Sequence, residues 1–138
     1  MASKQLIVLT GASGKQCSHL IPRLYDHMTL RLVVNSQSSK ERLAEQWPNA
    51  EVTMADLTDL ESCQAVLANA TTAFHIGPSF HPRETEIGYN MIEAAKVYAT
   101  GAKSTLKHFV YSSVLHTQLR KLLNHDCNTA GRQPRLYG

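Results

Sequence analysis

Residues 6–17 combine a short apolar run with a glycine-containing turn, and this combination points directly to ligand chemistry. Four apolar residues, 6–9, lead into a turn with glycines at Gly11 and Gly14, and an amphipathic stretch follows. Glycine permits a sharp turn and a close approach of the backbone to a bound group. A helix that begins there presents unpaired N–H groups and a partial positive charge. The spacing therefore predicts a diphosphate site at the main-chain amides of residues 11–16.

The turn has the spacing G-x-x-G-x-x-C, with Cys17 where the dinucleotide fingerprint has its third glycine. That glycine serves close packing of the helix on the strand, so a small side chain is acceptable there. A P-loop is a competing interpretation, because Gly14 and Lys15 resemble its G-K pair. Leu9 and Gln16 argue against it, since they stand where a P-loop has its first glycine and its magnesium-binding hydroxyl. A glycine turn that serves packing alone stays open as an alternative.

The segment after the second apolar run bears on which nucleotide is preferred. An NAD site usually has Asp or Glu about 20 residues beyond the turn, where it binds the ribose hydroxyl. This chain has the polar run 35–40, in which Asn35, Ser36 and Lys40 are candidate cofactor contacts. No acid there would repel a 2′-phosphate, so the sequence favours NADP, with NAD as the other possibility. The alternative is a solvated loop in which Ser39 caps a helix.

The third and fourth apolar runs also end in candidate cofactor contacts. Asp56 and Leu57 follow the third run, where an adenine edge would lie. Gly77 and Pro78 follow the fourth run, beside the expected position of the nicotinamide ribose. The alternatives are that Asp56 is a turn residue and that the Gly-Pro pair only terminates a strand.

Strand-like and helix-like segments alternate along the chain and must position these residues. This alternation predicts an α/β fold, a Rossmann-like doubly wound parallel sheet of about five strands in the order 3-2-1-4-5. Its ligand crevice lies outside the carboxyl ends of the strands. Strands are predicted at 6–10, 30–34, 51–54, 72–76 and 106–111, and helical segments at 15–27, 40–47, 60–67, 87–98 and 115–123.

Several helix ends carry local signals. Pro22 lies inside the first helix, where it predicts a kink. Thr58 and Glu61 form a capping-box pattern at the start of the third helix. Gly101 is a stop signal beyond the fourth helix.

The 138 residues suit one domain, predicted as an NAD(P)-binding Rossmann domain over 1–126 with an irregular tail over 127–138. A net charge of +3 without a basic block argues against nucleic-acid binding. No apolar run approaches the roughly 18 residues of a membrane span. Three widely spaced cysteines favour reduced thiols and a cytoplasmic location, with the nucleus accessible by diffusion. The histidines and cysteines lack metal-ligand spacing, so no metal site is predicted.

In four places the sequence resembles the NmrA-like family of atypical short-chain dehydrogenases/reductases. The resemblance extends from about residue 5 to about residue 126 and is carried by residues 10–16, 55–57, 90–95 and 108–113. It implies a Rossmann fold that binds NAD(P), in a family that includes reductases and regulators that sense the cofactor without turning it over. The implied contacts are the diphosphate for Gly11, Ser13, Gly14 and Gln16, the adenine for Asp56 and Leu57, and the nicotinamide for Ser112.

The chain departs from its relatives in the residues that would carry catalysis. Classical relatives use Tyr-x-x-x-Lys, whereas none of the five tyrosines here is followed by Lys four residues later. Ser112, His116 and Lys121 are the remaining candidates. The family's later strands and substrate lobe are also missing, so we expect a C-terminally truncated member. The hypotheses are an NAD(P)H-dependent oxidoreductase, a non-catalytic NAD(P)-sensing or partner-binding module, and a truncated inactive isoform.

Overall fold

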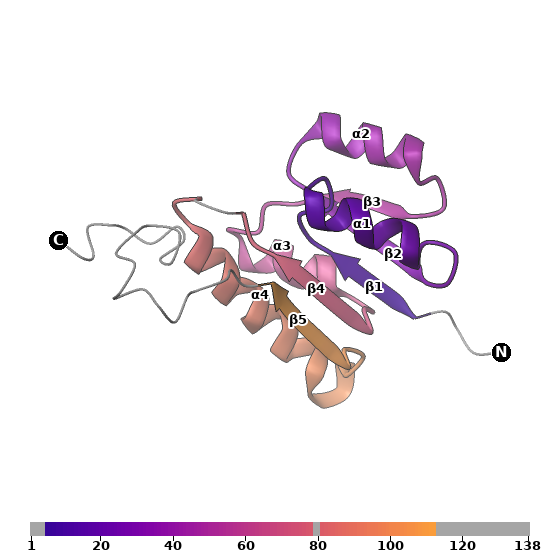
Figure 1. Cartoon of the computed structure of the whole chain (residues 1–138). Helices are drawn as coiled ribbons and strands as arrows, with labels where there is room; N and C mark the ends of the chain where they lie inside the picture. The colour runs from indigo at the N-terminus through magenta and orange to yellow at the C-terminus, as the bar shows by residue number, and fades with distance from the viewer. Residues whose placement is uncertain (1–4, 79–80, 113–138) are drawn as a thin grey trace, which may run out of the picture.

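The computed structural model describes residues 5–78 and 81–112, which form a parallel sheet flanked by helices on both faces (Figure 1). The five strands are arranged in the order β3-β2-β1-β4-β5, and every neighbouring pair is parallel. The fold class and the strand order predicted from the sequence are thereby confirmed. The strands are β1 (Leu6–Leu9), β2 (Thr29–Val34), β3 (Glu51–Met54), β4 (Thr72–Ile76) and β5 (His108–Ser112). The helices are α1 (Lys15–Leu24), α2 (Gln37–Gln46), α3 (Leu60–Leu67), α4 (Glu84–Ala99) and the short 3-10 helix η1 (Gly101–Lys103).

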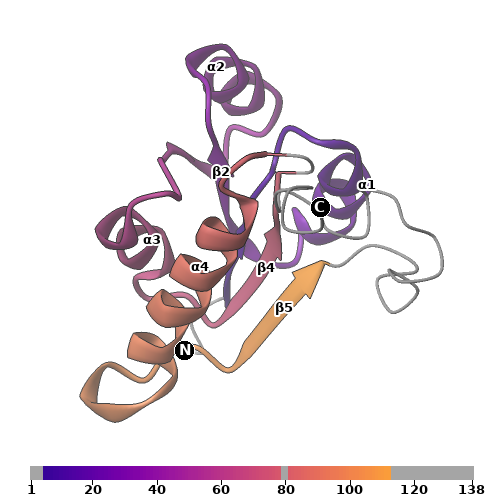
Figure 2. The same ribbon diagram turned by 90° about the vertical axis from the view of Figure 1, so that its left-hand side faces the viewer.

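Two apolar layers hold the helices on the sheet. Successive residues of a strand point to opposite faces, so Val8 packs in the layer with α3 and α4, while Ile7 and Leu9 pack in the layer with α1 and α2. Figure 2 shows α3 and α4 on one side of the sheet and α1 on the other. The sheet is therefore buried on both faces, as parallel sheets generally are.

The helix starts differ from those predicted because adjacent polar residues compete as caps. Ser36, rather than Ser39, caps α2, since its hydroxyl accepts from the Ser39 amide at 3.3 Å. The helix therefore begins at Gln37, three residues earlier than predicted. Asp59, rather than Thr58, caps α3, because its carboxylate accepts from the Ser62 amide at 2.9 Å.

Other bounds shift by a few residues. α1 continues through Pro22 and ends at Leu24, earlier than the predicted end at His27. β5 begins at His108, two residues later than predicted, although Leu106 before it is buried. Among the described residues β5 pairs with β4 alone and forms one edge of the sheet. The helix predicted at 115–123 and the tail 127–138 lie outside the described residues.

Candidate functional site

A cleft of about 630 Å³ opens at the carboxyl ends of the strands. Its walls are the glycine turn after β1 and the segments that follow β2, β3 and β4. This volume lies within the range of small-molecule sites, roughly 300–1,000 Å³. The predicted cofactor residues that line it are Gly11, Ser13, Gly14, Asn35, Asp56, Leu57 and Gly77. Gln16, Ser36, Lys40 and Ser112 are not among its lining residues.

The glycine turn is tightly packed at two glycine positions. Gly11 has a φ of 62°, in the left-handed region that favours glycine. A Cβ there would lie 3.2 Å from the Ile76 carbonyl oxygen and 3.3 Å from the Ile76 Cβ. At Gly14 a Cβ would lie 3.2 Å from the Gly11 carbonyl oxygen. The turn is therefore packed tightly against the end of β4.

Two of the amides predicted to face a ligand point into the protein instead. The Ala12 amide donates to the Val33 carbonyl at 3.2 Å, and the Gly14 amide donates to the Gly11 carbonyl at 3.0 Å. The first of these hydrogen bonds links the turn to β2, and the second lies within the turn itself. No side chain caps α1, whose first amides, at Lys15 and Gln16, have no intrahelical acceptor. The anion-binding potential of the turn therefore lies at the start of α1.

Cys17 takes the packing position expected from the fingerprint. Its side chain is fully buried, and its thiol donates to the Thr10 carbonyl at an Sγ–O distance of 3.8 Å. Burial raises the pKa of the Cys17 thiol to about 11, so the group is neutral at physiological pH. The residue fills the space between helix and strand and carries no charge toward the cleft.

Gln16 and Ser112 meet across the carboxyl end of the sheet. The Ser112 hydroxyl donates to Oε1 of Gln16 at 3.1 Å. The contact joins the first turn of α1 to the end of β5. The two residues were predicted to bind the diphosphate and the nicotinamide, and the structure brings them together beside the cleft.

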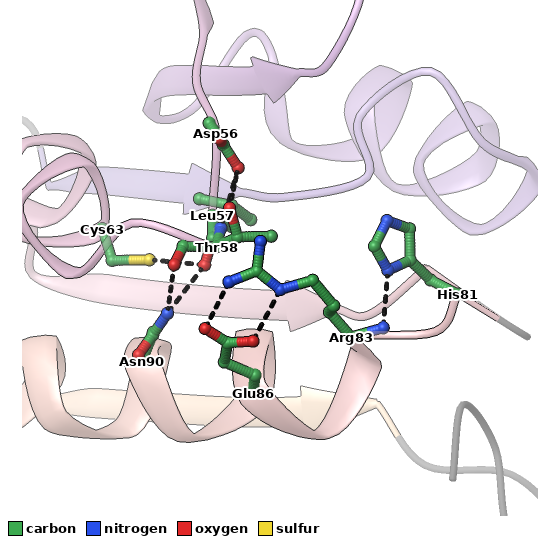
Figure 3. Close-up of polar contacts among 8 residues, drawn as sticks. All are labelled: Asp56, Leu57, Thr58, Cys63, His81, Arg83, Glu86 and Asn90. Atoms are coloured by element: carbon green, nitrogen blue, oxygen red, sulfur yellow. Dashed lines mark hydrogen bonds and ion pairs between the residues drawn. The ribbon is translucent and has the colours of Figure 1, made fainter. Parts of the chain in front are cut away.

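The loop after β3 has its own polar structure (Figure 3). The Asp56 carboxylate accepts from the Thr58 hydroxyl at 2.6 Å and from the Thr58 amide at 2.9 Å. These hydrogen bonds lower the pKa of Asp56, which is exposed and stays ionised. The side-chain amide of Asn90 donates to the carbonyls of Leu57 and Thr58 at 3.2 Å and 3.0 Å, which ties this loop to α4.

The start of α4 forms the neighbouring rim, where Arg83 and Glu86 form a salt bridge. Both groups are exposed, and the Arg83 charge also favours the ionised form of Asp56. The His81 ring accepts a hydrogen bond from the Arg83 amide at 3.0 Å. His81 lines the cleft as well, so this segment supplies polar groups that the sequence interpretation did not anticipate.

The segment after β2, residues 35–40, contains no acidic side chain. Asn35 lines the cleft, and the Ser36 hydroxyl lies within hydrogen-bonding distance of both the Ser39 amide and the Ser39 hydroxyl. The first turn of α2 contains no acidic residue. Lys40 lies on α2 and is half-buried, away from the lining of the cleft.

The catalytic candidates are not assembled in the part of the chain that can be described. Ser112 is half-buried at the end of β5, while His116 and Lys121 lie outside the described residues. Within residues 5–78 and 81–112, no three His, Cys, Asp or Glu side chains are grouped so that they could hold a metal ion. In those same ranges no helix has the length and apolar character needed to cross a membrane.

Comparison with known families decides the classification. The sequence profile of the NmrA-like family matches residues 3–125. The chain belongs to the NmrA-like family. None of the curated proteins compared with this NmrA-like chain matches it in sequence.

Solved structures of similar fold support the Rossmann-like architecture. The NADPH-dependent quinone oxidoreductase QOR2 from Escherichia coli, complexed with NADPH, is 24% identical with a TM-score of 0.66, over 81% of this chain and 38% of that one. The negative transcriptional regulator NmrA is 24% identical with a TM-score of 0.69, and the match covers 85% of this chain and 36% of that one. The yeast methylglyoxal/isovaleraldehyde reductase Gre2, complexed with NADPH, is 16% identical with a TM-score of 0.68, and the match covers 82% of this chain and 38% of that one. The NmrA-like chain thus spans less than half of each of these proteins.

Proposed function

We propose that the cleft binds a nicotinamide adenine dinucleotide, with NADP preferred over NAD. The observation that carries this proposal is the convergence of the glycine turn, the β2 end and the β3 end on one cleft of about 630 Å³. A dinucleotide needs a diphosphate site and an adenosine site side by side. The carboxyl ends of β1, β2 and β3, which are neighbours in the sheet, offer room for both. Family membership and the NADPH-bound structures of similar fold support the same ligand.

Each part of the dinucleotide has a chemical counterpart in the cleft. The diphosphate fits at the start of α1, where Gly14 leaves the helix end uncovered by any side chain. The adenine fits beside Leu57, with the ionised Asp56 as an acceptor for its amino group. The ribose fits near Asn35, and Gly77 at the end of β4 leaves space for the second ribose. The residues present therefore fit the cofactor.

The preference for NADP rests on charge at the start of α2. The Ser36 hydroxyl and the first amides of α2 can donate to a 2′-phosphate, and the first turn carries no acid that would repel it. Lys40 on the same helix adds positive charge nearby. An NAD-specific site would instead need a carboxylate after β2 to accept from the ribose hydroxyls.

For the chain as it stands we propose binding without turnover, as in a cofactor-sensing or partner-binding module. Bound NADPH supplies hydride, but the protein must still protonate the substrate. Burial and the nearby Glu84 raise the pKa of Tyr111, the tyrosine at the end of β5, so its phenol is a weak proton donor. An NAD(P)H-dependent oxidoreductase is the second candidate, favoured by the reductases of similar fold.

Fluorescence titration with NADPH and NADH tests the proposal directly. We expect NADPH to bind the folded protein with higher affinity than NADH. The absence of binding by both nucleotides to folded protein would reject dinucleotide binding. NADPH oxidation with a panel of quinones and aldehydes then separates the two candidates, because turnover would reject the non-catalytic module.

A further inference from the structure

His75 of β4 is a fully buried imidazole that dinucleotide binding, as proposed above, does not use. Its Nδ1 lies 2.8 Å from the hydroxyl oxygen of Thr10, the residue that follows β1. Its Nε2 is buried and, among the described residues, has no hydrogen-bond partner. A buried polar atom without a partner destabilises the folded state, so a histidine at this position calls for a role that an apolar residue could not fill.

The ring is held firmly in place from the side of β5. Tyr111 packs against His75 edge-to-face, with ring centroids 4.9 Å apart and planes at 87°. The Tyr111 hydroxyl in turn occupies the space beside Gly88 of α4, where a Cβ would lie only 2.5 Å from it. Tyr111 thus packs against the same imidazole that lies within hydrogen-bonding distance of Thr10.

The Thr10 hydroxyl joins the two loops that form the inner wall of the cleft. It accepts a hydrogen bond from the Ile76 amide at 2.9 Å, and the Thr10 amide donates to the Phe74 carbonyl at 3.1 Å. Thr10 precedes Gly11, and Ile76 precedes Gly77, so the hydroxyl lies where both loops leave the sheet. Gly11 and Ile76 are also in contact, because a Cβ at Gly11 would lie 3.3 Å from the Ile76 Cβ.

We propose that His75 is a positioning residue for dinucleotide binding, which orients the Thr10 hydroxyl and thereby sets the spacing between the glycine turn and the end of β4. This role rests on the proposed function. The Thr10–His75 hydrogen bond forms whichever of the two atoms donates. When His75 Nδ1 donates, the Thr10 hydroxyl can donate to the Ile76 carbonyl at 3.3 Å. Burial also lowers the pKa of His75 to about 4, so the imidazole is neutral at physiological pH.

Asn and Leu at position 75 provide a matched test. The two side chains are nearly the same size, and both leave the space of the imidazole partly empty. The Asn side-chain amide places a polar atom where Nδ1 stands, whereas Leu places a methyl group there. We expect His75→Asn to bind NADPH within about threefold of the wild type and His75→Leu to bind about tenfold more weakly, the value of one hydrogen bond.

A purely structural role predicts the opposite order. Leu leaves no buried polar atom unsatisfied, so His75→Leu would be at least as stable as His75→Asn and would bind NADPH at least as well. Equal affinities, or affinities that simply follow the melting temperatures, would overturn the proposal. Should His75→Leu fail to fold, Thr10→Val removes the hydrogen bond to His75 from its other end, together with the one from the Ile76 amide, and must weaken NADPH binding at least as much.

Amide hydrogen exchange in the unliganded protein separates this inference from the proposed function. We expect the Ile76 amide, which donates to Thr10, to exchange faster in His75→Leu than in His75→Asn. Equal exchange would refute the link between His75 and Thr10. If the wild type bound no dinucleotide, the proposed function would fail and the positioning role with it, while the exchange data would still show whether His75 orients Thr10.

Discussion

The Ser112 hydroxyl donates a hydrogen bond to Oε1 of Gln16, at 3.1 Å, between residues 96 positions apart in the chain. The contact holds the first turn of α1 against the end of β5, next to the proposed diphosphate site. The hydrogen bond restrains the Gln16 side chain, whose amide nitrogen is a potential donor to a ligand.

This contact predicts coupling between the two side chains in NADPH binding. We expect Ser112→Ala and Gln16→Ala each to weaken NADPH binding a few-fold, and the double variant to be no weaker than Gln16→Ala. The reason is that Ser112 acts only through the orientation of Gln16. A double-mutant cycle measured by titration checks this, and additive losses would show that the two residues act independently.

Gly11 and Gly101 form a natural pair for testing the glycine turn. Both have a positive φ, 62° and 76°, but only Gly11 lines the cleft and packs against Ile76. A Cβ at Gly101 would meet nothing within 4 Å. We expect alanine at either position to cost about 1–2 kcal/mol of unfolding free energy through backbone strain, with a further loss at Gly11 because the added Cβ is crowded by Ile76. Only Gly11→Ala is expected to weaken NADPH binding, and equal binding by the two variants would contradict the assignment of the turn.

Ser36 offers a test of the NADP preference that preserves the helix cap. Asp and Asn are both good N-caps, so Ser36→Asp and Ser36→Asn should both leave α2 intact. The Asp carboxylate would repel a 2′-phosphate, so we expect Ser36→Asp to bind NADPH about tenfold more weakly while its NADH affinity is unchanged. Ser36→Asn serves as the control. A uniform effect of Asp on both nucleotides would place the 2′-phosphate elsewhere.

The neutral His75 predicts a pH-dependent stability. Its pKa is about 4 in the folded protein, below the usual 6.5, because burial disfavours the charged ring. As pH falls from 6.5 to 4, the unfolded chain takes up a proton that the folded protein excludes, so the unfolding free energy decreases. The contribution is fully present above pH 6.5 and amounts to on the order of 3 kcal/mol across this window.

Chemical denaturation at several pH values measures this effect. Within residues 5–78 and 81–112, the ionisable side chain packed against the ring is Tyr111 from β5, with Glu84 of α4 next to the Tyr111 hydroxyl. Thr10, which follows β1, carries no charge. We expect the stability of His75→Leu to decline less steeply than that of the wild type between pH 6.5 and 4. Parallel declines would mean that other groups dominate the acid sensitivity.

The periodic part of the fold follows from the sequence, whereas the contacts between distant residues do not. Apolar runs of strand length, separated by helical spacing, were sufficient for the five strands and their order. The caps were harder to predict, because Ser36 and Ser39 are chemically equivalent and the backbone conformation decides between them. Thr58 and Asp59 posed the same choice at α3.

The site was predictable to the extent that it lies where strands end. Gly11, Asp56 and Gly77 follow strands, and all three line the cleft. Asn90 was missed as a loop-holding residue, although a polar residue beside the buried stripe of an amphipathic helix signals a need for a partner. The contact of His75 with Thr10 joins β4 to the end of β1, and no local spacing reveals it.

The most direct test of the central claim is to follow the backbone amide NMR signals while NADPH is added. We expect shifts of the signals from the cleft residues Gly11, Ser13, Asn35, Asp56 and Gly77, and no change near Asn49 at the opposite end of the sheet. Dinucleotide binding in this cleft would be contradicted if saturating NADPH left the cleft signals unchanged or shifted only the signals of residues outside the cleft.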